Sequence, residues 1–253
     1  MPRIVKEIIS RSILTKTGIP GFDYCVNPYV GCEHGCRYCY AGFMKRFTGH
    51  SEPWGDFVDV KVNAPQLLQK QLRRARQGSV IVASVTDPYQ PVEKTYRLTR
   101  GCLEALQEHS FDVDLLTRSP LCLRDMDLFK RFEKITVGFS IGTHDEEVKK
   151  LFEPRAPAIR SRVEALRTLH SGKINTYAFI GPMLPLDPSK LVSMLEGTVD
   201  EVLIDQMNYS SKVKGIYHRA GWDRYLEGNY FTLFGNDLKE RFKKTGIPVT
   251  MCF

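Results

Sequence analysis

Residues 27–40 read Asn-Pro-Tyr-Val-Gly-Cys-Glu-His-Gly-Cys-Arg-Tyr-Cys-Tyr, and this stretch holds three of the seven cysteines of the chain. Cys32, Cys36 and Cys39 follow a C-x3-C-x2-C spacing at the end of a short apolar run. Three thiolates on one short loop can bind three irons of a [4Fe–4S] cluster, and they leave the fourth iron open to a substrate or cofactor. The spacing therefore predicts an iron–sulfur site on a loop that spans residues 27–43.

Zinc is the alternative metal for this loop. A structural zinc ion takes four protein ligands, so His34 or Cys25 would have to supply the fourth. Zinc sites more often combine two closely spaced cysteine pairs that lie far apart in the sequence. This chain has only one group of closely spaced cysteines. If it binds no metal, His34 is expected to be a solvated loop residue. Gly31 and Gly35 let the backbone turn tightly, which helps the three sulfurs to point inward.

The composition is that of an ordinary soluble globular protein. The chain has 253 residues, a net charge of +7 and 42% hydrophobic residues. It contains no run of 18 apolar residues, and its first residues lack the apolar stretch of a signal peptide, so we expect a cytoplasmic protein without a membrane segment. In a reducing cytosol, clustered cysteines indicate a metal site before they indicate disulfides. The basic residues are scattered among acidic ones, so charge alone favours solvated helix faces over a nucleic-acid site.

Short apolar runs that favour β-strands alternate with segments of helical periodicity. The expected strands are 24–30, 79–85, 113–117, 135–141, 174–180 and 201–206, with a seventh at 248–253. The helical segments carry apolar residues three and four positions apart, which we expect to face the core. These stripes are Leu68, Leu72 and Ala75; Leu98, Cys102 and Ala105; Cys122, Met126 and Phe129; and Ile159, Val163, Leu166 and Leu169.

Alternating strands and helices predict a parallel sheet with right-handed crossovers. Six successive units of this kind wind into a barrel or an open partial barrel, so the expected fold is α/β, with a single domain over residues 1–253. The active site of such a fold lies at the carboxyl ends of the strands. Residues 208–253 form a C-terminal extension, part of which is rich in aromatic residues and would cover or cap the barrel mouth.

The cysteine loop resembles that of the radical S-adenosylmethionine (SAM) superfamily, in which an aromatic residue, here Tyr38, precedes the third cysteine. Further segments make the chain similar to the spore photoproduct lyase-like branch of that superfamily. These segments are 27–29, 39–41, 86–93, 116–119, 124–125 and 152–157. The resemblance extends from about residue 12 to about residue 185 and implies a partial (β/α)6 TIM-like barrel, in agreement with the strand pattern.

The resemblance also implies the cofactors and the chemistry. Cys32, Cys36 and Cys39 would bind a [4Fe–4S] cluster, and its open iron would bind the amino and carboxylate groups of SAM. One electron from the cluster would cleave SAM to methionine and a 5′-deoxyadenosyl radical, while the protein orients the cofactor and excludes water. The implied SAM contacts are Tyr38 and Tyr40 near the adenine, Ser84 and Thr86 near the amino and ribose groups, Asp87 in the loop that follows, Arg118 near the carboxylate, and Ser140.

The sequence departs from the family pattern after the second expected strand. The Gly-Gly-Glu-like motif that binds the SAM amino group in many members is absent, and residues 84–87 stand in its place. Spore photoproduct lyase uses a cysteine there as hydrogen-atom donor, whereas this chain has Ser84, whose O–H bond is too strong for that role. The resemblance therefore extends to the cofactor chemistry and not to the substrate, and no catalytic residue is identified.

Two functions follow from these observations. The first is a radical SAM enzyme that abstracts hydrogen from an unidentified substrate, with nucleic acid as one of the open classes. It needs SAM and a reducing electron donor of the flavodoxin or ferredoxin type, and we expect a monomer. The alternative is a non-enzymatic nucleic-acid-binding module that is stabilised by zinc on His34 and the three loop cysteines.

Overall fold

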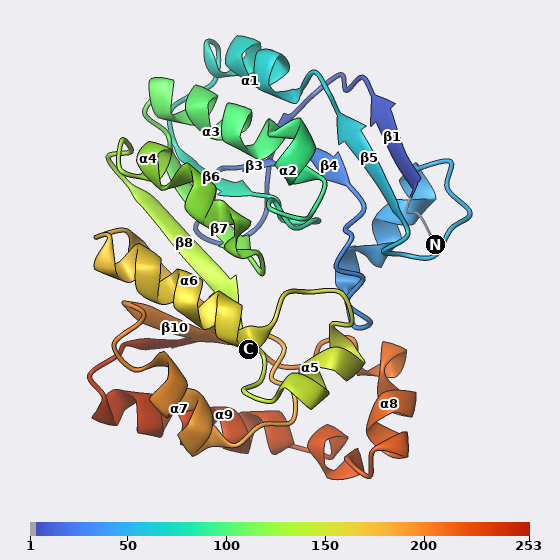
Figure 1. Ribbon diagram of the computed structural model, residues 1–253, viewed down its shortest axis with the longest axis vertical. Coiled ribbons are helices and arrows are strands. Elements are labelled where there is room, and N and C mark those ends of the chain that lie inside the picture. Colours follow the sequence, from blue (N-terminus) through green and yellow to red (C-terminus); the bar gives the residue numbers. More distant parts are fainter. Residues whose placement is uncertain (1–3) are drawn as a thin grey trace. The chain divides into compact units, whose positions relative to one another are not determined.

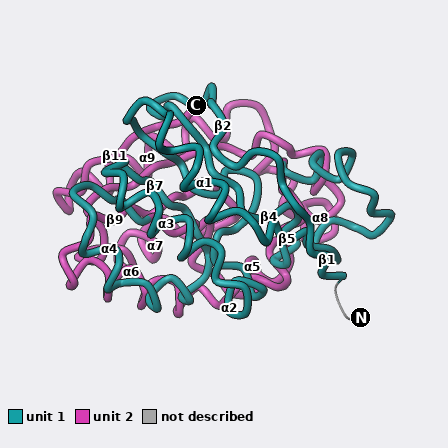
Figure 2. The backbone as a smooth tube through the Cα atoms, turned by 90° about the horizontal axis from the view of Figure 1, so that it is seen from above, with its two compact units in different colours: residues 1–35, 41–137 teal, residues 36–40, 138–253 magenta. Residues whose placement is uncertain are grey.

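The computed structural model describes residues 4–253 of the chain (Figure 1). The chain divides into two compact units, which Figure 2 colours separately. Unit 1 holds residues up to 35 together with 41–137, and unit 2 holds residues 36–40 together with 138–253. The cysteine loop thus contributes residues to both units. That all 253 residues form one domain stays a prediction.

A mostly parallel sheet forms the centre of unit 1. Its parallel strands are β3 (Tyr24–Val26), β6 (Ser79–Val82) and β7 (Asp112–Thr117), and the first residues of β8 (Ile135–Ser140) belong to the same unit. β2 (Leu14–Lys16) pairs antiparallel with β3 and forms the edge. The carboxyl ends of β6 and β7 therefore point the same way, and the loops after them meet at one edge of the sheet.

Unit 1 has a second, three-stranded sheet that the sequence analysis missed. Its order is β1-β5-β4, with β1 (Ile4–Ile8) parallel to β5 (Phe57–Lys61) and β4 (Tyr29–Val30) antiparallel to it. β1 gives no strand signal because its sequence, Ile-Val-Lys-Glu-Ile, does not alternate apolar and polar residues, and four of the five residues are exposed.

The expected strand 24–30 is wrong as a single element, because it divides into β3 and β4, which belong to different sheets. Asn27 and Pro28 separate the two strands. Pro28 has no N–H for a ladder, and Asn27 is bonded outside any strand, since its Oδ1 accepts from the Val85 amide at 3.1 Å and its carbonyl accepts from Lys61 Nζ at 2.8 Å. The cysteine loop therefore begins directly after the short β4.

Helices of unit 1 follow its strands, as expected. The stripe Leu98, Cys102 and Ala105 is buried in α3, whereas Ala75 lies beyond the end of α1, and the stripe that starts at Cys122 divides between a 3₁₀ helix and a single α-turn. The helices are η1 (Tyr40–Phe47, which begins in unit 2), α1 (Ala64–Leu72), α2 (Glu93–Tyr96), α3 (Leu98–Glu108), η2 (Pro120–Asp125) and α4 (Met126–Phe129).

Unit 2 contains the end of β8 and three further parallel strands. β10 (Glu201–Ile204) pairs with β9 (Asn175–Ile180) on one side and with β11 (Val249–Met251) on the other. The seventh expected strand is thus present as β11. The helices are α5 (Glu146–Phe152), α6 (Ile159–Ser171), α7 (Pro188–Leu195), η3 (Ser210–Lys212), α8 (Lys214–Arg219), η4 (Asp223–Leu226) and α9 (Tyr230–Lys244).

Local sequence explains where several elements of unit 2 begin. The side chains of Asp145 and Asp187 accept hydrogen bonds from the first amides of α5 and α7, which leaves fewer backbone donors unsatisfied. The expected C-terminal extension consists mainly of α8, η4 and α9 before it ends in β11. Within residues 4–253, no helix is long and apolar enough to cross a membrane.

A buried ionic network connects the helices that follow β6 and β7. The Asp125 side chain is fully buried, and its carboxylate accepts from Arg100 at 2.8 Å, from Arg124 at 2.7 Å and from the Tyr89 hydroxyl at 2.9 Å. Arg124 also binds the buried Glu93 at 2.8 Å. Buried charges of this kind are tolerated when every partner is present, so the network fixes the positions of α2, α3 and η2.

Asp125→Ala removes the carboxylate that both guanidinium groups share. We expect it to lower the free energy of unfolding by about 3 kcal/mol, because Arg100 loses its buried carboxylate and Arg124 loses one of two. Asp127→Ala is the matched control, since Asp127 binds the same Arg100 at 2.8 Å but has a side chain that is 61% exposed. Loss of this exposed ion pair should lower the free energy of unfolding far less. Urea denaturation measures both variants, and equal losses would contradict this account.

Candidate functional site

The first half of the cysteine loop belongs to unit 1 and makes a tight turn. Gly31 has φ +93°, and a Cβ at that position would collide with the Phe57 carbonyl. Gly35 has φ +57°, and its amide donates to the Cys32 carbonyl at 3.2 Å. Both glycines are therefore required by backbone geometry, and the turn leaves Cys32 only 8% exposed.

The second half of the loop, residues 36–40, belongs to unit 2. Cys36 and Tyr38 are buried in a core cluster, and Cys39 is partly buried against it. The Cys39 amide donates to the Cys36 carbonyl at 3.1 Å, and the Arg37 amide donates to the Phe152 carbonyl at 2.9 Å. The Lys212 ammonium donates to the Cys39 carbonyl at 2.6 Å. Contacts with α5 and η3 therefore fix the backbone of this half without using the thiols.

The three cysteines offer suitable donors for an iron–sulfur cluster. Every cysteine of the chain, all seven of which lie in the described part, is outside any disulfide. Thiolate sulfur is the ligand that such clusters take, so the donor set fits. Within residues 4–253, no three side chains of His, Cys, Asp or Glu form a ready-made metal site. The assignment of the ligands therefore depends on the donor set and on the family.

Asp87 links the cysteine loop of unit 1 to the end of β7. It is 4% exposed, and its Oδ2 lies 3.2 Å from Nε2 of His34. Its carboxylate also accepts from the Thr117 hydroxyl at 2.7 Å and from the Arg118 amide at 2.8 Å. Burial raises the pKa of Asp87, but His34 and these donors outweigh burial and lower the pKa to about 2. Asp87 is therefore held as a carboxylate within a hydrogen-bonded loop.

His34 is buried, and the expectation of a solvated loop histidine is wrong. It is 1% exposed because Asp87 holds its ring inside the loop. Neither ring nitrogen makes a hydrogen bond among the residues that the structure describes, although Nε2 lies 3.2 Å from the Asp87 carboxylate.

Ser84 and Thr86 lie beyond the end of β6 and beside the start of the cysteine loop. β6 ends at Val82, earlier than expected, because Ala83 adopts φ +64°, which a strand does not allow. The Thr86 hydroxyl donates to the Gly31 carbonyl at 2.6 Å, and the Ser84 hydroxyl accepts from the Asn27 amide group at 3.3 Å. Both residues therefore support the backbone next to Cys32.

A chain of polar contacts in unit 2 joins Tyr38 to Ser140. The Tyr38 hydroxyl donates to Glu153, and Glu153 pairs with Arg162 at 2.6 Å. Arg162, which is 1% exposed, donates to the Ser140 carbonyl at 3.0 Å. The sequence analysis named both ends of this chain and missed its middle. Glu153 lies in segment 152–157, which supported the family resemblance, whereas nothing in the sequence of α6 marks Arg162.

The Ser140 hydroxyl lacks a partner in this chain of contacts. Ser140 is the last residue of β8 and is 1% exposed, and its Oγ makes no hydrogen bond within residues 4–253. A buried hydroxyl without a partner is costly unless a ligand supplies one. Its position at the carboxyl end of a strand fits a ligand contact.

The other expected site residues lie near these groups within their own units. Arg118 follows the last residue of β7, and its amide binds Asp87. Tyr40 is 43% exposed and stacks on Tyr209, with ring centroids 6.3 Å apart. Unit 1 thus brings together Ser84, Thr86, Asp87 and Arg118 around the first half of the cysteine loop, and unit 2 brings Tyr38 and Ser140 into one network.

Asp87→Asn tests the charge at this position. Because the folded pKa is about 2 and the ordinary value is 3.8, the carboxylate stabilises the fold above pH 3.8, and this contribution disappears as the pH falls toward 2. We expect the variant to be less stable than the wild type by about 2 kcal/mol near pH 6, and the difference to shrink near pH 3. Urea denaturation at both pH values measures it. A difference that does not change with pH would contradict the charged state of Asp87.

Known proteins are similar to this chain in sequence. The family model described as the Radical SAM superfamily matches residues 26–198. An uncharacterized protein of Methanocaldococcus jannaschii is 40% identical over 226 residues, which cover 88% of this chain and 83% of that protein. A radical SAM Nalpha-GlyT isomerase of Pseudomonas phage M6 is 27% identical over 163 residues, which cover 62% of this chain and 32% of the phage protein. The chain spans between 56% and 58% of the length of further relatives.

The fold is that of a solved spore photoproduct lyase, in a structure complexed with dinucleoside spore photoproduct. The TM-score is 0.65 at 15% identity, over 98% of this chain and 82% of the lyase chain. This likeness confirms the expected α/β fold with a partial, TIM-like arrangement of parallel strands. The family model covers well over half of the chain, and its members are enzymes that cleave SAM with an iron–sulfur cluster. This chain belongs to the radical SAM superfamily.

Proposed function

We propose that Cys32, Cys36 and Cys39 hold a single [4Fe–4S] cluster and that its fourth iron binds SAM. The observation that carries this proposal is the cysteine loop, which presents three thiols from a backbone that other groups fix in place. A cluster held there would supply the electron that splits SAM into methionine and a 5′-deoxyadenosyl radical. A reducing compartment such as the cytoplasm suits this chemistry, and a flavodoxin or ferredoxin would supply the electron.

The residues of the chain would orient the loop and bind SAM. Thr86 binds the backbone carbonyl of Gly31 before Cys32, Asp87 contacts the side chain of His34 after it, and Glu153 accepts from the Tyr38 hydroxyl. The burial of these groups keeps water away from the loop, which strengthens every electrostatic contact with a bound ligand.

The SAM contacts that we propose lie in the cysteine loop or, within each unit, at or just after the carboxyl end of a strand, where such a fold binds its ligands. The residues are Tyr38, Tyr40, Ser84, Thr86, Asp87, Arg118 and Ser140. Arg118 would pair with the SAM carboxylate through its planar guanidinium. Ser140 would give its unpartnered hydroxyl to SAM.

Nucleic acid is the first substrate class to test. The chain carries a net charge of +7, and the lyase with the same fold binds a dinucleoside photoproduct. The name of the phage relative describes an isomerase of Nalpha-GlyT. Ser84 stands where the lyase has its cysteine hydrogen-atom donor, so we propose a different reaction on a substrate of this class.

Anaerobic reconstitution of the full chain tests the cluster. We expect about four irons and four sulfides per chain, and 5′-deoxyadenosine after addition of dithionite and SAM. The Cys36→Ala variant should lack both the cluster and the 5′-deoxyadenosine, because it removes one of the three cluster ligands. Iron and sulfide analysis with chromatography of the nucleoside provides the measurement.

His34→Ala separates this proposal from the zinc-stabilised module. The cluster proposal predicts a nearly unchanged iron content, since His34 is bound to Asp87 and is not needed as a ligand. The zinc module predicts one zinc ion that His34→Ala releases, together with a colourless protein and no nucleoside product. That second set of results would overturn the proposal.

Ser140→Ala tests SAM binding separately from activity. We expect the Kd for SAM to rise about fivefold on the reconstituted protein, because one hydrogen bond to the ligand is lost. The stability of the apoprotein should not fall, since the hydroxyl has no partner there. The control is Thr176→Val, which removes a buried hydroxyl bond of 2.9 Å to Asp200 at the amino end of β9. It should lower stability and leave SAM affinity unchanged; the same pattern for Ser140→Ala would exclude its role.

A further inference from the structure

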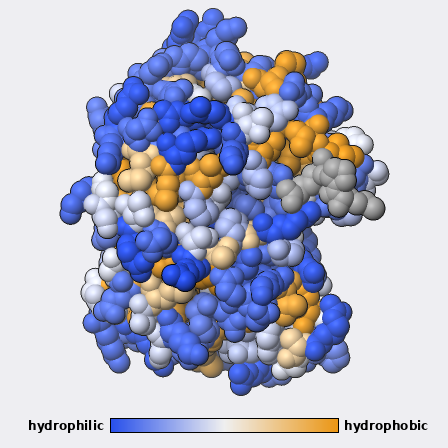
Figure 3. All heavy atoms as spheres, viewed as in Figure 1, coloured by the Kyte–Doolittle hydropathy of each residue, from blue (hydrophilic) through white to orange (hydrophobic). Residues whose placement is uncertain are grey.

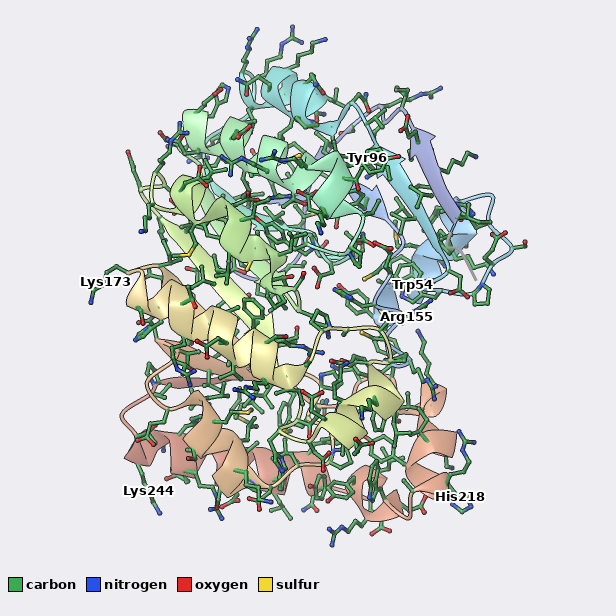
Figure 4. All side chains as sticks on the ribbon, in the orientation of Figure 1. Trp54, Tyr96, Arg155, Lys173, His218 and Lys244 are labelled. Carbon is green, nitrogen blue, oxygen red and sulfur yellow. The ribbon has the colours of Figure 1, made fainter. Side chains whose placement is uncertain are left out.

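A shallow pocket of about 290 Å³ lies on unit 2 beside the second half of the cysteine loop. α5 and α8 form its walls, and these helices lie side by side in Figure 1. His218, labelled in Figure 4, marks the exposed side of α8 next to one of the lining residues. The lining residues are Arg37, Leu151, Ile216, Arg219 and Ala220.

The charge of the pocket is positive and uncompensated. Arg37 and Arg219 are both exposed, and neither makes an ion pair within the described part of the chain. Acidic side chains near these residues in the sequence have other partners, since Asp223 lies 3.3 Å from His218, Glu147 pairs with Lys150 and Glu153 pairs with Arg162. Near α5 and α8, Figure 3 shows a few hydrophobic residues among hydrophilic ones. The pocket therefore combines two guanidinium groups with an apolar floor.

Two of the lining residues connect the pocket to the cysteine loop. Arg37 is part of the loop, and Ile216 packs in the same core cluster as Cys36. Arg37 is exposed between two buried residues, Cys36 and Tyr38, so its side chain projects to the outer side of the loop. Ile216 therefore connects the pocket to the core cluster that contains Cys36.

We propose that this pocket is the docking site for an acidic electron-donor protein, an inference that rests on the function proposed above. A carboxylate of the donor would bind between Arg37 and Arg219, and apolar side chains around it would cover Leu151 and Ile216. The anionic hydroquinone of flavodoxin would then give one electron to the oxidised cluster and become the neutral semiquinone, so that no proton is released. The pocket offers this donor the outer face of the loop that holds Cys36.

Two features favour a protein over other anionic partners. The volume lies just below the range of small-molecule pockets, about 300–1,000 Å³, and suits an inserted side chain. The floor is formed by Leu151, Ile216 and Ala220, whereas contacts to a nucleic-acid backbone are mainly polar and charged. Unpaired arginines next to apolar residues are typical of protein interfaces.

Arg219→Glu on the reconstituted holoenzyme tests the docking site, with a flavodoxin of acidic surface as the probe. We expect its Kd for flavodoxin, measured by calorimetry, to rise about tenfold at low salt, and the rate of cluster reduction by flavodoxin hydroquinone to fall by a similar factor. Reduction by dithionite should stay unchanged. Arg160→Glu, an equal charge change at an exposed position of α6, should leave all three values near those of the wild type.

The outcomes are distinguishable. If Arg219→Glu and Arg160→Glu bind flavodoxin and accept its electron equally well while dithionite still yields 5′-deoxyadenosine, the docking site is wrong and the proposed function stands. If Arg219→Glu weakens binding of a single-stranded oligonucleotide and leaves flavodoxin binding intact, the pocket serves nucleic acid and the inference is overturned. If dithionite produces no reduced cluster in the wild type, the proposed function fails and the docking site fails with it.

Discussion

Buried carboxylates hold the cysteine loop, and the rest of the site depends on that constraint. A loop that presents three thiols has little regular backbone pairing of its own, so its position must come from other groups. In unit 1, Asp87 binds His34 inside the loop and the end of β7 at the same time. In unit 2, Glu153 binds Tyr38 and is itself neutralised by the buried Arg162. Each carboxylate therefore fixes a segment of the loop within its own unit.

This constraint explains why charged residues occupy the interior of the protein. A buried carboxylate without partners would take up a proton or destabilise the fold, whereas the contact with His34 and the hydrogen bonds from Thr117 and Arg118 keep the pKa of Asp87 low. Asp125 and Glu93 follow the same principle farther from the loop, where arginines neutralise them. The buried carboxylates around the loop thus have their partners within the protein itself, which is what a preorganised binding site requires.

The sequence predicted the parts of the fold that depend on strand periodicity. The apolar runs predicted β7 to β11, and Ser140 lies at the end of β8 as expected. The metal site that the C-x3-C-x2-C spacing predicts and the SAM contact of Ser140 stay predictions. The sequence did not predict the features that tertiary contacts determine. β1 has an exposed surface and no apolar alternation, and the 24–30 run looked continuous because its break at Asn27 depends on partners far away in the sequence. Arg162 resembles any helix arginine until the fold buries it beside Glu153.

The two roles that we propose for the loop, ligand binding and electron uptake, would separate onto its buried and exposed residues. Cys36 and Tyr38 face a core cluster, whereas Arg37 between them faces solvent. α8 repeats this division, since Ile216 and Tyr217 pack inward and Arg219 is exposed. Such alternation allows a partner to approach the loop without opening the water-excluded side.

Electron paramagnetic resonance of the reduced protein, with SAM labelled isotopically at its amino nitrogen, tests the central claim most directly. The account predicts the signal of one reduced [4Fe–4S] cluster, which changes when SAM is added and acquires a coupling to the labelled nitrogen. It also predicts that Cys36→Ala shows neither the signal nor the coupling. A cluster signal that SAM leaves unchanged, with no coupling to the label, would contradict the claim that the loop cysteines leave one iron open for SAM.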